Sequence, residues 1–232
     1  ISLTSNQSLL LTEIEPADKD EIDHILRSNG IDAEDQINLL HRYAMACPAL
    51  PTCGLAVTES ERVIPSILDR IQTLLNKLGL KQEHFVIRMT GCPNGCARPY
   101  MAELGFVGSA PNSYQLWLGG SPNQTRLAQP FMQKMNIDDL ETTLEPMFAF
   151  FKKGRQSSEG FGDFCDRIGF EALRNFSESY VPAKGASGRR KHRVGISADV
   201  YRQLKDAPKA QGMSMAQIAE SANAAYLQEQ SH

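Results

Sequence analysis

Four of the five cysteines stand in two close pairs along the chain. Five residues separate Cys47 from Cys53, and three separate Cys92 from Cys96. Thirty-eight residues lie between the two pairs. Four thiolates on two short loops can converge on one metal centre, and soft thiolate ligands select iron–sulfur clusters or zinc. The spacing predicts a metal centre rather than a disulfide framework, which is typical of smaller secreted chains.

Zinc is the main alternative on spacing alone. Structural zinc sites usually have roughly two to four residues between paired cysteines, and the first pair here is wider than that. The flanking Pro48, Pro51 and Pro93 are rigid and apolar, which suits a shell that keeps water from a redox centre. Gly91 and Gly95 allow backbone amides to approach cluster sulfides closely. These features favour an iron–sulfur cluster, with zinc and unliganded thiols as the alternatives.

Longer stretches around the cysteines resemble the sulfite reductase hemoproteins. The likeness rests on residues 46–53, ACPALPTC, and residues 89–100, MTGCPNGCARPY. It continues through MAELGFVG (101–108), YQLWLGG (114–120) and GFGDF (160–164). The resemblance covers residues 1 to about 176, roughly three quarters of the chain. The ARPY version of the second loop is similar to the ferredoxin-dependent branch of the family rather than the branch coupled to an NADPH flavoprotein.

The resemblance implies six-electron reduction of sulfite to sulfide, with ferredoxin as the electron donor. In the family, the cysteines that match Cys47, Cys53, Cys92 and Cys96 hold a 4Fe–4S cluster, and the sulfur of Cys96 is also the axial ligand of a siroheme iron. The family's basic sulfite-binding residues lie mainly in an N-terminal half that this chain lacks. We therefore expect a C-terminal portion that is inactive alone, and we assign no catalytic residue. Nitrite reductases share the cluster pattern and are the nearest alternative.

Five polar residues are candidates for cofactor contacts. Arg88 and Arg98 flank the second cysteine loop, where each could bind a siroheme carboxylate. Asn94 lies between the two cysteines of that loop. Asn6 and Gln7 match a polar pair near the family's siroheme pocket. Ordinary surface, pairing or turn roles are the alternatives.

Strands and helices are expected around the two loops. Apolar spacing predicts helices at residues 16–29, 37–46, 64–78 and 136–151, short helices within 161–176, and strands at 8–14, 85–89, 104–107 and 114–118. Thr58 and Glu61 have the spacing of a capping box before the long helix. Trp117 and Cys165 are expected in the core. The pattern predicts an α+β fold in which helices pack on a mixed sheet.

A basic tail differs in charge from the rest of the chain. Residues 1–183 carry a net charge of −7 and residues 184–232 carry +4. We expect a cluster and siroheme domain at 1–180, a linker at 181–188, and a small strand–helix–helix module at 189–232 that lies outside the reductase pattern.

The strand–helix–helix tail resembles ribbon-helix-helix modules, which pair their strands as dimers and insert them into the DNA major groove. The DNA contacts would then be Lys191, Arg193 and Ser197. Pro208 falls where the first helix of such a module should continue. A dimerisation or docking appendage is therefore an alternative. A metal-binding body with a DNA-binding tail is the alternative function for the whole chain.

Composition excludes a membrane protein. Apolar residues make up 41% of the chain and charged residues 22%, and no apolar run reaches the ~18 residues that span a bilayer. Thiolates kept for a metal indicate a reducing compartment. We expect the cytoplasm, or the plastid stroma in a photosynthetic eukaryote. Because the sequence begins at Ile1 without an initiator methionine, we expect a piece of a longer protein.

Overall fold

The computed structural model describes residues 1–31 and 37–182. They belong almost entirely to one compact unit, Ile1–Val181. Most of the expected linker and the whole strand–helix–helix module, including Lys191, Arg193 and Ser197, lie outside the described residues. The domain division and the tail therefore stay predictions.

The centre of the fold is a mixed five-stranded sheet with the order β3-β4-β5-β6-β7. Its strands are β3 (Met45–Ala46), β4 (Ile87–Thr90), β5 (Leu104–Ala110), β6 (Ser113–Leu118) and β7 (Gln129–Asn136). The first three run parallel, whereas β5, β6 and β7 pair as antiparallel neighbours. The predicted α+β class with a mixed sheet is confirmed.

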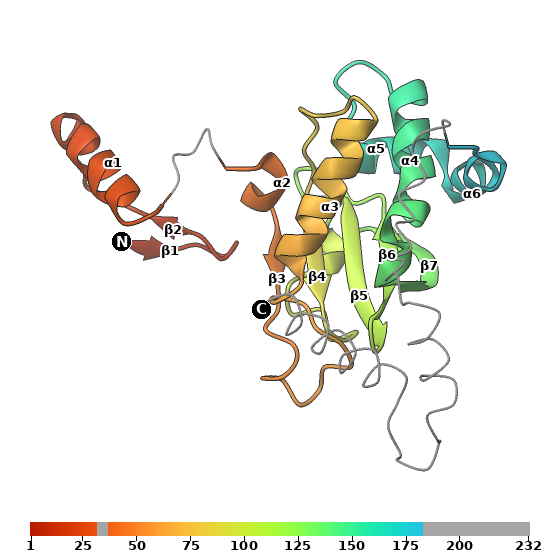
Figure 1. Cartoon of the computed structure of the whole chain (residues 1–232), viewed down its shortest axis with the longest axis horizontal. Helices are drawn as coiled ribbons and strands as arrows, with labels where there is room; N and C mark the ends of the chain where they lie inside the picture. Colours follow the sequence, from red (N-terminus) through yellow and green to blue (C-terminus); the bar gives the residue numbers. More distant parts are fainter. Residues whose placement is uncertain (32–36, 183–232) are drawn as a thin grey trace, which may run out of the picture. The chain divides into compact units, whose positions relative to one another are not determined.

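Helices cover one face of this sheet. Helices α3 (Ile64–Lys77) and α4 (Leu140–Gly154) lie side by side in front of the strands (Figure 1). Alternate strand residues such as Ile87 and Phe106 join the helices in one buried core. After residue 37 the described chain also contains α2 (Leu39–Arg42), α5 (Phe161–Ile168), α6 (Phe170–Ser179), η3 (Pro99–Met101) and η4 (Ile137–Asp139).

Side chains of successive strand residues alternate between the two faces of a sheet. Ile87 and Met89 belong to the core beneath the helices. Arg88 and Thr90 therefore lie on the opposite face, yet both are buried. This second face, away from α3 and α4, carries the polar residues of the candidate site.

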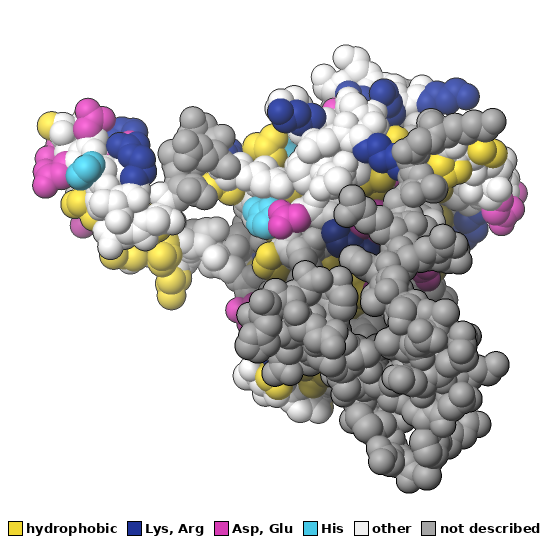
Figure 2. All heavy atoms as spheres, viewed as in Figure 1, with side chains coloured by type: hydrophobic (Ala, Val, Ile, Leu, Met, Phe, Trp, Pro, Cys, Tyr) yellow, Lys and Arg dark blue, Asp and Glu magenta, His cyan; other side chains and the backbone are white. Residues whose placement is uncertain are grey.

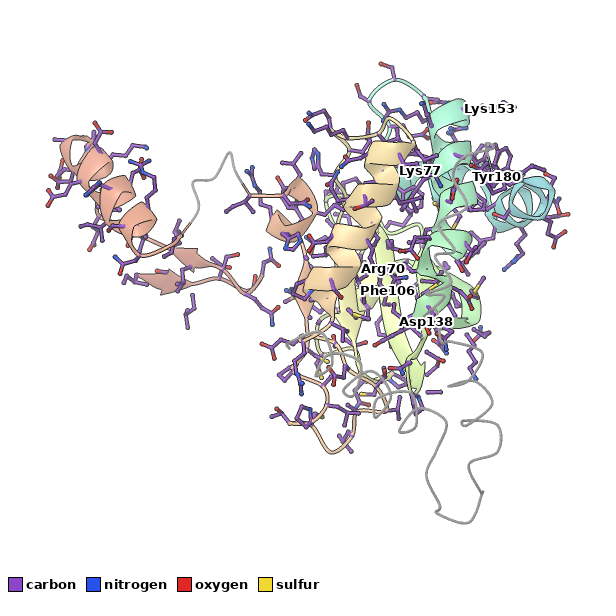
Figure 3. The ribbon with its side chains drawn as sticks, viewed as in Figure 1. Arg70, Lys77, Phe106, Asp138, Lys153 and Tyr180 are labelled. Atoms are coloured by element: carbon purple, nitrogen blue, oxygen red, sulfur yellow. The ribbon has the colours of Figure 1, made fainter. Side chains whose placement is uncertain are left out.

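Two ion pairs join α3 to α4. Arg70 donates to both carboxylate oxygens of Glu141, at 2.6 Å each, and Lys77 lies 2.9 Å from Glu145. Figure 3 shows Arg70 and Lys77 on α3 beside α4, with Tyr180 near the same helix. The hydrogen bond from Arg70 lowers the pKa of Glu141 below its ordinary value. The Arg70–Glu141 pair is partly exposed at both ends and so contributes little stability, whereas the carboxylate of the Lys77–Glu145 pair is buried.

The N-terminal part forms a small hairpin and a helix. Strands β1 (Ser2–Leu3) and β2 (Leu9–Leu10) pair antiparallel, and η1 (Pro16–Asp18) leads into α1 (Lys19–Ser28). The hairpin exposes apolar side chains, among them Leu3 at 84% and Leu9 at 67%. Figure 2 shows yellow, apolar side chains on this part of the chain, at the left. The strand that was expected at residues 8–14 is limited to β2, Leu9–Leu10.

Tertiary contacts shorten or shift several other expected elements. The helix predicted at 37–46 is limited to α2, because Met45 and Ala46 pair with β4 instead. Thr58 does not cap the long helix, since its hydroxyl donates to the Tyr114 hydroxyl at 3.1 Å. Strand β7 was not expected at all. Trp117 is only half-buried, whereas Cys165 is fully buried as predicted.

The described helices include none that is long and apolar enough to cross a bilayer.

Basic residues cluster where α4 ends, and Figure 3 shows Lys153 near that end of the helix. Lys152 donates to the carbonyl of Leu78 at 2.6 Å, and Arg155 pairs with Glu83. These cations therefore satisfy a helix end and a neighbouring acid.

A buried carboxylate connects the sheet to α5. Glu103, only 2% exposed, accepts hydrogen bonds from the backbone amides of Val86 at 2.8 Å and Gly162 at 3.0 Å. Burial raises the pKa of Glu103 to about 7, although both amide bonds act in the opposite direction. The folded chain therefore holds a proton here that the unfolded chain loses at a lower pH.

This difference predicts the sign of a pH effect on stability. Between the ordinary carboxyl pKa and pH 7, the folded chain binds more protons, so the unfolding free energy falls as pH rises. The raised pKa of Glu103 lowers the unfolding free energy by at most about 3 kcal/mol across this pH range. Glu103→Gln should flatten this fall in chemical denaturation measured from pH 5 to pH 7.5. Glu171→Gln, on an exposed part of α6, is the control. An unchanged pH slope in Glu103→Gln would contradict the assignment.

Candidate metal centre

Parallel strand pairing brings the two cysteine loops together. Cys47 directly follows β3, and Gly91 and Cys92 directly follow β4. The carboxyl ends of neighbouring parallel strands lie at the same edge of a sheet, where loops and ligand sites meet. Figure 1 shows the first loop, in orange, leaving the end of β3 next to β4. The strand register continues into the loops, because the amide of Cys47 donates to the carbonyl of Met89 at 3.2 Å.

Gly91 holds the two loops against each other. Its amide donates to the sulfur of Cys47 at 3.3 Å, and its carbonyl accepts from the amide of Val57 at 2.9 Å. A Cβ atom on Gly91 would lie 2.5 Å from the Cβ of Ala49 and 2.6 Å from the carbonyl oxygen of Thr58. Only glycine permits this approach, so Gly91 positions an N–H group on a candidate ligand sulfur.

The four sulfurs differ in exposure. Cys47 and Cys92 are buried, Cys53 is half-buried and Cys96 is exposed, and none forms a disulfide. Among the described residues, no group of three or more His, Cys, Asp or Glu side chains converges on a single metal ion. A cluster in which each thiolate binds its own iron places its ligands farther apart than zinc does. The thiolate set, the N–H···S contact and the apolar neighbours Ala49 and Ala97 fit an iron–sulfur cluster.

Tyr100 supports the second loop from its outer side. Its hydroxyl donates to the carbonyl of Pro93 at 2.6 Å, and its ring packs on Trp117 with centroids 4.6 Å apart. Gly95 has a φ of +71°, and a Cβ there would lie 2.6 Å from the Tyr100 ring. Burial, and then the neighbouring charge of Cys92, raise the pKa of Tyr100. Trp117 is thus half-buried because it braces this loop rather than the core.

Tyr114 supports the returning arm of the first loop. Its hydroxyl donates to the carbonyl of Glu59 at 2.7 Å and accepts from Thr58 at 3.1 Å. Ser60 donates to the carbonyl of Met89 at 2.7 Å, which connects this arm to β4 as well. Sequence analysis missed these positioning roles, because the partners are 29 to 56 residues apart.

Four of the five predicted polar residues meet beside the first loop. Gln7 pairs with the backbone of Ala46 through two hydrogen bonds of 2.8 and 3.1 Å, just before Cys47. The side-chain oxygen of Asn6 accepts from Arg98 at 3.1 Å and from Arg88 at 3.3 Å. The same patch therefore contains both arginines and the polar pair.

The fifth predicted residue, Asn94, is exposed, and no described side-chain hydrogen bond connects it to this patch. Gln124 takes part instead, because its side-chain oxygen accepts from Arg88 at 2.8 Å. Nothing in the local sequence around Gln124 indicated this role, since Arg88 lies 36 residues away.

Comparisons with known proteins match these features. Residues 40–184 match the family described as the nitrite and sulphite reductase 4Fe-4S domain. The chain is 58% identical over 225 residues to a ferredoxin-type sulfite reductase of Synechococcus elongatus, covering 97% of this chain and 36% of that protein. It is 42% identical over 168 residues to the NADPH sulfite reductase hemoprotein beta-component of Oceanobacillus iheyensis, covering 72% and 29%. The chain thus spans about a third of the length of the curated relatives it matches.

The fold is also shared with a solved structure. The NirA protein of Mycobacterium tuberculosis superposes with a TM-score of 0.62 at 23% sequence identity, over 74% of this chain and 33% of that one. At this identity the match shows a common fold.

The comparisons differ in how much of the tail they include. The match to the Synechococcus protein leaves only seven residues of this chain unaligned, so most of residues 189–232 belong to the shared sequence. The match to the family itself ends at residue 184, so the tail lies outside that pattern although this relative shares most of it. The hemoprotein of Oceanobacillus matches a shorter part of the chain.

The tight packing at Gly91 predicts a large effect of one methyl group. Gly91→Ala should lower the unfolding free energy by about 1–3 kcal/mol, because Ala49 and the Thr58 carbonyl must move. Gly54→Ala, in the same loop, is the control, since an added Cβ there meets nothing within 4 Å. Urea denaturation of both variants measures the difference. Equal stabilities would show that the two loops do not pack as described.

Proposed function

Because the chain belongs to the nitrite and sulphite reductase 4Fe-4S domain family, we propose that it is the part of a ferredoxin-dependent sulfite reductase that holds a 4Fe–4S cluster beside a siroheme. The observation that carries this proposal is the Gly91–Cys47 contact, which packs the two cysteine loops together at the ends of adjacent parallel strands. The whole enzyme would reduce sulfite to sulfide with six electrons.

In this proposal Cys47, Cys53, Cys92 and Cys96 are the cluster ligands. Cys96 would also bind the siroheme iron, and its exposure supports this role because a second group can reach only an accessible sulfur. When bound, the two centres supply a path for single electrons to the substrate. The chain's own contribution is to exclude water from Cys47 and Cys92 and to donate the Gly91 amide to sulfur, both of which tune a cluster's potential.

Arg88, Arg98, Asn6 and Gln7 are proposed as cofactor-contacting residues. Their meeting beside Cys47 supports this role, because anionic propionate and acetate groups of a tetrapyrrole need cationic partners. Asn94 stays a candidate for contact from the exposed side of its loop. The residues that bind sulfite would belong to the remaining two thirds of the longer protein.

Sulfite as substrate and ferredoxin as donor are supported by the relatives. The Synechococcus protein that matches 97% of the chain is a sulfite reductase of the ferredoxin type. Nitrite remains the alternative substrate, because the family includes both kinds of reductase. A reducing compartment, the cytoplasm or a plastid stroma, would keep the four thiols available for iron.

Replacing single cysteines tests the cluster assignment. After reconstitution with iron and sulfide, the chain should bind about four irons and absorb broadly in the visible. Each of four single variants should lower the iron content and the absorbance: Cys47→Ser, Cys53→Ser, Cys92→Ser and Cys96→Ser. Cys165→Ser is the control, since Cys165 is fully buried and burial raises its pKa well above the ordinary value. A colourless zinc-loaded chain, or iron lost only in Cys165→Ser, would contradict the proposal.

Substrate choice requires the full-length protein that contains this chain. With reduced ferredoxin as donor, kcat/KM should be higher for sulfite than for nitrite. Steady-state rates on the two anions, measured with the same preparation, give the comparison. A higher kcat/KM for nitrite would support the alternative reductase.

A further inference from the structure

Thr90 carries a buried hydroxyl group that has no hydrogen-bond partner in the described structure. The residue is the last of β4 and is 0% exposed. Its Oγ1 neither donates nor accepts a hydrogen bond there. Burying a hydroxyl without a partner lowers stability, because the group gives up its hydrogen bonds to water. A valine side chain has the same shape and would fill this place without that loss, so packing alone does not account for the hydroxyl.

The hydroxyl lies on the face of the sheet that carries Cys47. Ala46 pairs with Met89 in the parallel ladder, and both belong to the core beneath the helices. One step further along this register Cys47 lies across from Thr90, and the amide of Cys47 donates to the carbonyl of Met89 at 3.2 Å. Cys47 packs in a small apolar cluster apart from that core. Because side chains alternate along a strand, Cys47 and Thr90 both lie on the second face of the sheet.

The backbone beside Thr90 already contacts a candidate ligand sulfur. The peptide group that joins Thr90 to Gly91 supplies the amide that donates to the sulfur of Cys47 at 3.3 Å. Cys92 follows directly, and Cys47 and Cys92 are both buried. The Thr90 side chain therefore branches from the chain next to the point where the two cysteine loops meet.

Two other buried hydroxyls beside the first loop are satisfied by the protein itself. Thr58 donates to the hydroxyl of Tyr114 at 3.1 Å, and Ser60 donates to the carbonyl of Met89 at 2.7 Å. Both bonds hold the returning arm of the loop in place. Thr90 lies in the same region without such an acceptor, so its acceptor is better supplied by a bound group than by the described chain.

We propose that the Thr90 hydroxyl donates a hydrogen bond to a sulfur atom of the bound iron–sulfur cluster. This inference rests on the proposed function. The thiolate and sulfide sulfurs of a cluster are negatively charged acceptors, and hydrogen bonds to them are among the factors that set its reduction potential. The reduced cluster carries one more electron, so the bond stabilises it more than the oxidised cluster and raises the potential. Thr90 thereby adds a side-chain donor to the amide donor of Gly91.

The reduction potential of the reconstituted chain measures this bond. Thr90→Val keeps the shape of the side chain and removes the donor. The equilibrium should therefore shift about tenfold toward the oxidised cluster, which is about 59 mV for one electron. Thr90→Ser keeps the hydroxyl and should restore most of the potential. Thr142→Val, at an exposed position of α4, is the control and should leave the potential unchanged. A redox titration followed by visible absorbance gives the four values.

The metal-free chain gives a second measurement. Without a cluster the hydroxyl has no acceptor, so Thr90→Val should melt at the temperature of the unchanged metal-free chain or above it. Thr58→Val is the matched control, because the Thr58 hydroxyl is buried and donates to a protein partner. It should melt roughly 3 °C lower. Cluster binding should then raise the melting temperature of the unchanged chain more than that of Thr90→Val.

The outcomes separate this inference from the proposed function. If the unchanged chain binds no iron–sulfur cluster, the proposed function fails and the hydrogen bond fails with it. If the cluster forms but has the same potential in Thr90→Val as in the unchanged chain, only the Thr90 proposal is wrong. A metal-free Thr90→Val chain that melts lower than the unchanged chain would also overturn it, because the protein or a buried water would then satisfy the hydroxyl. A lower potential in Thr90→Val that Thr90→Ser restores supports the bond.

Discussion

The parallel pairing of β3 with β4 is the constraint on which the candidate site depends. Two residue pairs, Met45 with Arg88 and Ala46 with Met89, set the register of the strands. A slip of one residue would turn every side chain of β4 to the other face of the sheet. Arg88 would then point into the core beneath α3, and Gly91 would no longer meet the sulfur of Cys47. The register thus decides both which loop atoms touch and which face of the sheet is polar.

Local pattern was sufficient for the helices and insufficient for parts of the sheet. The apolar spacing of Ile64–Lys77 and Leu140–Gly154 predicted α3 and α4, because each buries a continuous stripe of its own residues. Strand β7 was missed since its buried residues, Phe131 and Met135, are four apart and give no alternation. Irregular pairing with β6 produces this pattern. The helix predicted through residue 46 failed because strand pairing outweighed local helical spacing.

The site divides in the same way. The cysteines stand close in sequence, so their spacing and flanks were enough to predict a metal centre. Asn6 and Gln7 came from family resemblance, and Arg88 and Arg98 from their place beside the second cysteine loop. The structure brings all four into one hydrogen-bonded patch. Gln124 and Tyr114 could not be predicted as supports, because each acts through a partner that only the folded sheet brings near. A residue's distance along the chain therefore says little about its distance from the sulfurs.

The β1–β2 hairpin has a consequence for handling the chain on its own. A ribbon of two short strands has unpaired backbone donors and acceptors along both outer edges, and here Leu3 and Leu9 add exposed apolar surface to them. Such an edge can pair with strands of neighbouring molecules, and exposed apolar surface favours association with other apolar surfaces. In concentrated solution the isolated chain should therefore self-associate through this hairpin. Leu3→Lys or Leu9→Lys should reduce this self-association, because a charged side chain on an edge strand opposes pairing between molecules.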